Sequence, residues 1–410
     1  MYSVYTILEL LYLIKILDYY EEGLVKIIEY YIKTYTFLKN KELKEVVDIW
    51  CDNNTINKCY KQYGHIAFWD VFNVINMYEL FKSKLNFNSD ISRWNVSNVI
   101  NMNNMFKCAW CFNQPIGSWD VSNVIDMDYI FSCTHEFNQP LNSWNISSLQ
   151  NMNGLFHCSR NYNQPLNNWN TSNIINMKHL FYSTCKFNQN ISNWDVSNVI
   201  NMCGMFNTAE SFNQPLGSWD VSNVINMNSM FKGTIQFNQP LDTWDVFNVK
   251  DIGNMFENTK SFNQQIGSWD ISNVINIRCM FQSSKSFNQP INLWNVSNIT
   301  NMCALFNIAK SFNQPLDSWD VSNVTNMSYM FAVTEKFNKP LNSWDVSNVK
   351  NMTYMFQNAK VFNQPLESWD ILNIDDLFRI FHNAKSFNQP LNTWKSIKYD
   401  KFLKEAISCN

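Results

Sequence analysis

The sequence is poor in charge, glycine and proline. Only 16% of the 410 residues are charged, and the chain has nine Gly and ten Pro. So few Gly and Pro exclude collagen-like and low-complexity chains. The formal net charge of −3 gives no basic surface for nucleic acid or an anionic membrane, so we expect no nucleic-acid partner. With 46% hydrophobic and 16% aromatic residues, the composition is that of a packed protein and not of a disordered one.

A complete disulfide framework and a clear membrane span are also missing. Eleven Cys is an odd number, and reduced thiols are the expectation for a chain of this length. The apolar residues 1–20 are interrupted by Glu9 and Lys15, with no basic region before them and no small-residue cleavage site after them. A spanning helix needs about 20 apolar residues, so we expect an amphipathic capping helix and no membrane insertion. The missing signal peptide favours an intracellular location.

What the sequence does contain is a repeat of 25 residues. Fourteen of its 16 Trp follow one another at that interval, without insertion or deletion: Trp69, Trp94, Trp119, Trp144, Trp169, Trp194, Trp219, Trp244, Trp269, Trp294, Trp319, Trp344, Trp369 and Trp394. One Phe column runs from Phe81 to Phe381, and another runs from Phe87 to Phe387 with Tyr162 as its only substitute. Spacing this regular requires each unit to stack on the last in one orientation, which makes a solenoid.

Within one unit the apolar pattern changes its period. Residues 312–336 read FNQPLDSWDVSNVTNMSYMFAVTEK. The alternation over 316–321 predicts a strand with its apolar face inward. The spacing of three or four over 324–331 predicts a short helix or a helical turn, with Ser322 or Asn323 as its N-cap. Leu-x-x-Trp-x-Val is similar to the leucine-rich-repeat core. We therefore predict an α/β repeat, a leucine-rich-repeat-like right-handed solenoid of about thirteen 25-residue coils.

The two ends depart from the repeat and predict helical caps. Apolar residues share one helical face in three N-terminal stretches, residues 24–32, 43–50 and 56–63, with Gly64 as a stop signal. An open solenoid end exposes core and unpaired backbone, which such helices would cover. The predicted division is a helical N-terminal region and cap at 1–63, a repeat solenoid at 64–394 and a C-terminal cap at 395–410.

The repeat carries a family resemblance. The unit WDVSNVxNMxxMF…FNQPL resembles the BspA-type bacterial surface repeat, also catalogued as a domain of unknown function that is common in mycoplasmas and found in giant viruses. The stretch before the first Trp resembles the segment that opens such arrays, and together the resemblance covers residue 37 to about residue 395. It implies a leucine-rich-repeat-like fold, a surface or interaction role and a place at the cell surface, and it implies no chemistry.

Three polar or aromatic columns suggest ligands but have structural explanations. The residue after Trp is Asp in nine coils and Asn in four; a carboxylate column can bind calcium, but exchange with Asn favours a hydrogen bond to nearby backbone. The Asn of FNQP recurs from Asn88 to Asn388. It can form a polar row that binds a ligand, but we favour an Asn ladder whose side chains hydrogen-bond to backbone groups of the turns. The Trp column shares its strand face with Val, so we predict that it is buried and is no platform for sugars.

The cysteines suggest a metal site. Cys108, Cys133 and Cys158 occupy one column in successive coils, and Cys111, His135 and His157 are close to them in sequence. Cys108 and Cys111, with Cys133 and His135, are candidates for zinc ligands. In other coils the same position holds mainly Ser, Thr or Gly, so a column of small residues explains it too, and we predict no metal and no other cofactor. No nucleophile–base–acid set or phosphate loop stands out from the repeat, so we predict no catalytic residues and no enzyme.

Two functions are compatible with these patterns. The favoured one is a non-enzymatic, monomeric scaffold that presents an extended surface to a protein partner. The alternative is a carbohydrate- or calcium-binding surface or adhesion protein that uses the Asp/Asn and aromatic columns. Arg93, Phe247 and Leu293 break the polar outward positions and are the predicted partner-binding residues, because interface energy concentrates in a few such side chains. Phe247 can instead fold onto its neighbours.

Overall fold

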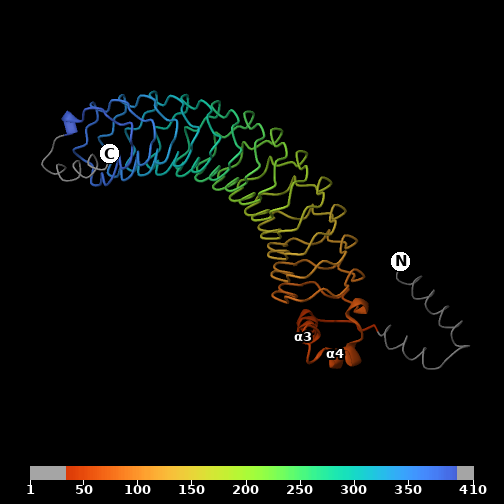
Figure 1. Ribbon diagram of the computed structural model, residues 1–410. Coiled ribbons are helices and arrows are strands. Elements are labelled where there is room, and N and C mark those ends of the chain that lie inside the picture. The colour runs from red at the N-terminus through yellow and green to blue at the C-terminus, as the bar shows by residue number, and fades with distance from the viewer. Residues whose placement is uncertain (1–33, 395–410) are drawn as a thin grey trace, which may run out of the picture.

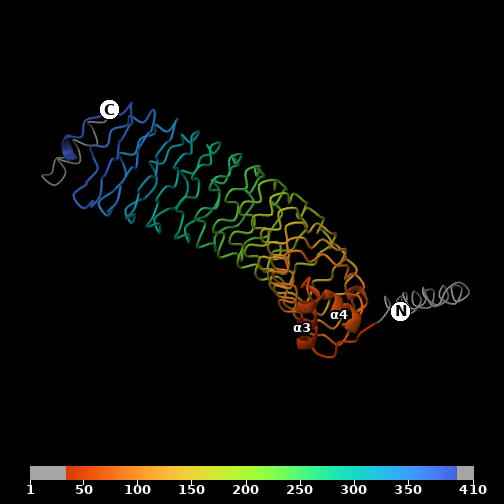
Figure 2. The same cartoon turned by 60° about the horizontal axis from the view of Figure 1, so that its bottom comes forward.

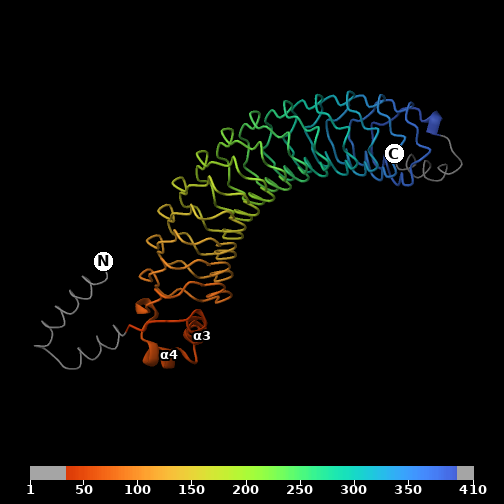
Figure 3. The ribbon, with the colours of Figure 1, turned by 180° about the vertical axis from the view of Figure 1, so that it is seen from behind.

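The computed structural model describes residues 34–394 as a stack of coils that bends into an arc (Figure 1). The colours follow one another along the arc in every view, so each coil lies beside the next one in sequence (Figures 1 and 3). The repeat solenoid predicted from the 25-residue period is therefore confirmed. The right-handed sense stays a prediction. The predicted helix within 24–32 and the C-terminal cap at 395–410 lie outside the described residues.

Within the described coils, neither the predicted strand nor a short helix is present, and turns take their place. From Trp69 to residue 394 the described chain contains one helical element, the single 3-10 turn η2 (Asn392–Trp394). In the same stretch, β pairing is limited to isolated parallel bridges such as Asn301 with Asn326 and Asn326 with Asn351. Each coil is therefore a chain of turns with one short contact of β type, and the α/β description does not apply to it.

The turns explain the apolar spacing that resembled a helix. In one coil, backbone N–H groups donate to carbonyls three residues earlier, from Trp319 to Leu316 at 3.1 Å and from Val324 to Val321 at 2.9 Å. The N–H of Met330 bonds the Met327 carbonyl in the same way, at 3.2 Å. Such a bond closes a β-turn. Because both ends of each turn are apolar and buried, a spacing of three arises without any helix.

A second set of backbone bonds joins one coil to the next. Met327 donates its N–H to the Asn351 carbonyl at 2.8 Å, and every second residue up to Val333 repeats the contact one coil on. Two residues in this stretch, Tyr329 and Val333, have φ near +58°. A positive φ is strained for residues with a Cβ. The equivalent residues of other coils take the same conformation whichever side chain they carry.

Aromatic stacks fill the interior. Phe106 stacks on Phe112 of its own coil at 4.0 Å between ring centroids and on Phe131 of the next coil at 5.8 Å. The fourteen Trp of the column are at most 4% exposed, so their predicted burial is confirmed. From Trp119 onward each indole also hydrogen-bonds to the preceding coil; Trp219 Nε1, for example, donates to the Ile191 carbonyl at 3.2 Å. The column is core and offers no exposed aromatic platform.

Helix α3 (Asn40–Trp50) covers the first coil, as the apolar pattern predicts, and α4 (Ile56–Tyr63) follows it. Both helices lie at the N-terminal end of the arc (Figure 2). Asn40 Oδ1 accepts the N–H groups of Ile75 and Asn76 at 3.1 and 3.3 Å. Lys44 Nζ donates to two carbonyls of the same coil, those of Glu79 and Leu80. The helix thus serves the Ile75 N–H and the Leu80 carbonyl, whose equivalents in later coils bond to the preceding coil. Its apolar face is buried through Leu43, Val46, Val47 and Trp50.

Candidate functional site

The Asn row of the FNQP turns is internal structure. Asn213 Oδ1 accepts the backbone N–H of Asn238 at 2.9 Å and the Nε2 amide of Gln239 at 3.1 Å. The equivalent donors of other coils, a backbone N–H and a Gln side-chain amide, bond in the same way to Asn88 in the first coil and to Asn363 near the end. The predicted Asn ladder is confirmed. Its amide oxygens already carry the hydrogen bonds that hold successive turns together.

The Asp and Asn that follow Trp also serve the backbone. Asp120 Oδ1 accepts the N–H of Ser122 at 3.1 Å and its hydroxyl at 2.6 Å. Asn95 makes both bonds to Ser97. The Ser122 hydroxyl and then the Ser122 N–H lower the pKa of Asp120. The predicted hydrogen bond to nearby backbone is therefore confirmed. Within residues 34–394, no three carboxylates come together as a possible cation site.

A row of exposed isoleucines is the main apolar feature of the surface. Its members stand six residues after Trp in their coils and are 38–60% exposed: Ile75, Ile100, Ile125, Ile175, Ile200, Ile225 and Ile275. We call this the isoleucine row. Gln150 and Lys250 interrupt it, and from residue 300 onward the position holds Thr, Lys or Asp. This row was not predicted from the sequence.

Two shallow hollows lie along the isoleucine row. The first, of about 450 Å³, is lined by Ile75, Asn98, Ile100, Asn123 and Ile125. The second, of about 570 Å³, is lined by Ser147, Ser148, Gln150, Asn173, Ile175, Asn198 and Ile200. We call this surface the isoleucine groove.

The polar wall of the isoleucine groove is held in place by hydrogen bonds between coils. Asn198 Nδ2 donates to the Ser172 carbonyl at 2.8 Å. Asn323, predicted as a helix N-cap, makes the equivalent bond to the Ser297 carbonyl at 2.8 Å. The N-cap assignment is therefore wrong, because no helix follows this Asn and its amide bridges two coils instead.

The three predicted partner-binding residues are exposed but lie in two different columns. Phe247 is 47% exposed and occupies the column of Ser147, which lines the groove. Leu293 is 82% exposed and shares with Arg93 the position just before Trp. The Arg93 guanidinium lies 5.4 Å above the ring of Phe68. Of the three, only Phe247 belongs to a column of the isoleucine groove, and contact with a partner stays a prediction for all of them.

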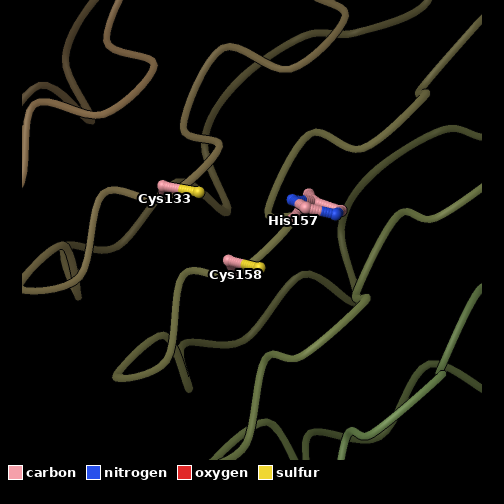
Figure 4. Close-up of side chains that lie close together, drawn as sticks. All are labelled: Cys133, His157 and Cys158. Atoms are coloured by element: carbon pink, nitrogen blue, oxygen red, sulfur yellow. The ribbon is translucent and has the colours of Figure 1, made fainter. Parts of the chain in front are cut away.

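A thiol cluster lies elsewhere on the repeat. One ligand atom from each of Cys133, His157 and Cys158 falls within 4.8 Å of the others. The two Cys are equivalent residues of successive coils, and His157 precedes Cys158 in the chain. Figure 4 shows the two Cys side chains one above the other, with their sulfur atoms pointing toward the side on which His157 lies. All three residues are half-buried.

The cluster favours one thiolate. Hydrogen bonds from Cys158 and then His157 lower the pKa of Cys133 to about 3. The hydrogen bond with Cys133 and burial raise the pKa of Cys158. These contacts therefore favour the thiolate at Cys133 and the protonated thiol at Cys158. Ser132 Oγ lies 3.3 Å from His157 Nδ1, and the Tyr182 ring stacks on the imidazole at 4.8 Å.

The structure brings only one of the four predicted zinc candidates, Cys133, into this cluster. Cys108 is its neighbour in the preceding coil and hydrogen-bonds to it. Cys111 is exposed. His135 Nδ1 lies 3.1 Å from the Cys158 carbonyl. His157 was noted near these Cys in the sequence but was not among the predicted ligands, although the 25-residue period places it beside Ser132 and hence next to Cys133.

A family model described as "Mycoplasma protein of unknown function, DUF285" matches four overlapping stretches, residues 53–168, 150–265, 236–333 and 313–406. No match was found among the curated proteins or among the solved structures. Within residues 34–394, no helix has the length and apolar character that crossing a membrane requires.

Proposed function

The chain belongs to the family described as Mycoplasma protein of unknown function, DUF285, and we propose that it is a non-enzymatic repeat scaffold whose isoleucine groove binds a protein partner. The observation that carries the proposal is the isoleucine row itself. Single exposed apolar residues are ordinary on a protein surface. A row that recurs in neighbouring coils and borders two hollows is the kind of patch that marks an interaction site.

The groove suits a partner of defined chemistry. Parallel backbone contacts such as Ile100 N–H to the Ile75 carbonyl, at 2.8 Å, set the row at a spacing of roughly 5 Å per coil. A partner segment that lies along the row can bury apolar side chains against several isoleucines at once. Asn98 and Asn123 offer polar edges beside them. From Ile75 to Ile225 the row contains no charged residue, so we expect binding that responds little to salt.

The scaffold itself needs little ordering to bind. The Asn side chains of the groove are already bonded to the preceding coil, as Asn198 is to Ser172. A surface fixed in advance loses less conformational entropy on association than a flexible one. The resemblance of the repeat to BspA-type bacterial surface repeats also supports a role in interaction.

The sharpest test replaces isoleucine with a residue that the chain already uses at the same position. Thr300 and Thr325 occupy this column in later coils, so a variant with Ile100, Ile125, Ile200 and Ile225 all changed to Thr keeps the fold. We expect the wild-type chain to capture a protein from the source cell that this fourfold variant does not capture. Equal capture by both chains, at equal melting temperature, would contradict the proposal.

Two single changes locate the contact further. Phe247→Ser changes a residue in the column of Ser147, which lines the isoleucine groove. Leu293→Ser changes a residue in the column just before Trp, which lies outside the groove. Both restore the residue that most coils carry, so both are expected to fold. We expect Phe247→Ser to weaken capture of the same partner and Leu293→Ser to leave it unchanged. The opposite order would move the interface away from the isoleucine groove.

A further inference from the structure

The thiol cluster has the composition and compactness of a metal site. One ligand atom from each of Cys133, His157 and Cys158 lies within 4.8 Å of the other two. Zinc holds Cys sulfur at about 2.3 Å and His nitrogen at about 2.0–2.1 Å in tetrahedral geometry, which places its ligand atoms roughly 3.5 Å apart. Side-chain rotations that draw these atoms together by about 1 Å therefore suffice to coordinate an ion.

We propose that Cys133, His157 and Cys158 bind a thiophilic transition-metal ion, and that Zn²⁺ is the ion that this ligand set suits. Thiolate and imidazole are the ligands that Zn²⁺ prefers in proteins, whereas calcium and magnesium take oxygen ligands. Three protein ligands leave the fourth tetrahedral position to solvent. The half-burial of all three residues gives an ion access without unfolding of the coil.

The requirements of the repeat do not account for this set. The column of Cys133 and Cys158 accepts Ser83, Ser183 and Gly233 in other coils, so packing alone does not select a thiol. The column of His157 holds Lys, Ser, Tyr, Asn, Glu, Gln or Ala in most coils. Within residues 34–394, the coils of Cys133 and Cys158 alone bring two thiols and an imidazole together.

A neighbouring hydroxyl supports the orientation of the imidazole. Ser132 Oγ lies 3.3 Å from His157 Nδ1, and the Tyr182 ring stacks against the imidazole face at 4.8 Å. Outer contacts of this kind fix the ring of a metal-binding His and tune its affinity. The imidazole is therefore oriented before any ion arrives, and rotation of the Cys side chains completes the site.

The test uses the full chain, reduced and metal-free, titrated with Co²⁺ as a spectroscopic substitute for Zn²⁺. We expect thiolate-to-cobalt charge-transfer absorption that saturates at one ion per chain and disappears when Zn²⁺ is added. We expect Cys133→Ser, Cys158→Ser and His157→Gln each to weaken binding by at least about tenfold. Ser83, Ser183 and Gln357 occupy the equivalent positions of other coils, so each variant is expected to fold, which circular dichroism checks.

Matched controls separate this cluster from the nearby candidates. Cys111→Ser and His135→Asn change a thiol and an imidazole that lie outside the cluster, and we expect both to bind Co²⁺ like the wild-type chain. Absence of charge-transfer absorption in the folded wild-type chain would overturn the proposal. So would binding that survives in all three cluster variants, or binding that is lost in the Cys111→Ser and His135→Asn controls.

Discussion

The side-chain oxygen of Asn213 accepts the backbone N–H of Asn238, one coil later, at 2.9 Å. The Nε2 amide of Gln239 reaches the same oxygen and the Asn213 carbonyl, each at 3.1 Å. One Asn side chain therefore joins the FNQP turns of two successive coils by hydrogen bonds. A backbone N–H left without a partner in such a place costs about 1–3 kcal/mol. The Asn ladder is therefore a main source of stability between coils.

Asn213→Ala removes this acceptor and leaves the Asn238 N–H and the Gln239 amide without it. We expect the free energy of unfolding to fall by about 2 kcal/mol, as measured by urea unfolding. Glu210→Ala is a surface control that is expected to change it by less than about 0.5 kcal/mol. Equal effects of the two substitutions would mean that the ladder adds nothing.

Trp219→Ala tests the core. Trp219 is 3% exposed, and its removal leaves both a cavity and an Ile191 carbonyl without its indole donor. We expect a loss of roughly 3–5 kcal/mol. Trp219→Phe keeps most of the ring and should cost less. A loss below about 1 kcal/mol for Trp219→Ala would be incompatible with a buried Trp column.

Tyr162 is an irregular member of the second aromatic column. Its ring stacks on Phe137 at 6.0 Å and on Phe156 at 3.9 Å, but its buried hydroxyl has no hydrogen-bond partner among the described residues. Burial raises the pKa of this hydroxyl. We expect Tyr162→Phe to raise the free energy of unfolding, measured by urea unfolding, by about 1 kcal/mol or more. The reverse change, Phe137→Tyr, should lower it, and a destabilised Tyr162→Phe chain would show that the hydroxyl finds a partner.

A fourth prediction concerns the backbone strain at Val333 and Asn358. Both are equivalent residues with positive φ, 57° for Val333 and 54° for Asn358. A left-handed conformation costs roughly 1–2 kcal/mol for most residues, and Asn bears it best after Gly. We expect Val333→Asn to raise stability by about 1 kcal/mol and Asn358→Val to lower it by a similar amount, measured by thermal unfolding. Shifts of the same sign in both variants would refute the explanation.

The carboxylates after Trp predict a pH dependence. Ser hydroxyls and then Ser N–H groups lower the pKa of five of them below the ordinary 3.8: Asp120, Asp195, Asp270, Asp320 and Asp345. A folded-state pKa below the unfolded one gives stability that is present above pH 3.8 and lost as the pH falls through the folded value. Changing all five to Asn keeps the hydrogen bonds, as Asn95 shows.

We therefore expect the fivefold Asn variant to lose less stability than the wild-type chain between pH 5 and pH 2. Urea midpoints measured across this range compare the two chains. Parallel curves would mean that these Asp residues titrate alike in the folded and unfolded states.

The period of the sequence predicted the stack, the buried Trp and the Asn ladder, because each depends only on which residues recur. It did not predict the path of the chain within a coil. Val321 and Val324 are spaced as in a helix, yet they close a turn, and a spacing of three occurs in both. Adjacent apolar residues were equally ambiguous. Val199 is fully buried and Ile200 is 44% exposed, and only the turn geometry decides which of them faces inward.

The thiol cluster was predicted in part. Cys133 was singled out, but His135 was paired with it because it is near in sequence. In a stack of 25-residue coils the spatial neighbours of residue 133 are residue 158 and those beside it, which include His157. The same period that identified the fold thus contained the ligand set, and proximity along the chain was the wrong measure.

The bonds between coils have a genetic consequence. Asn238 bonds to Asn213 exactly one unit back, and Asn213 bonds in the same way to Asn188. If residues 212–236 were deleted, Asn238 would meet Asn188, and Trp244 would find the Ile191 carbonyl in place of that of Leu216. Recombination between repeats of the gene can therefore lengthen or shorten the arc by whole units, because the same contacts between coils form again at the junction. An unequal exchange that removed 24 residues would disrupt every column at the junction.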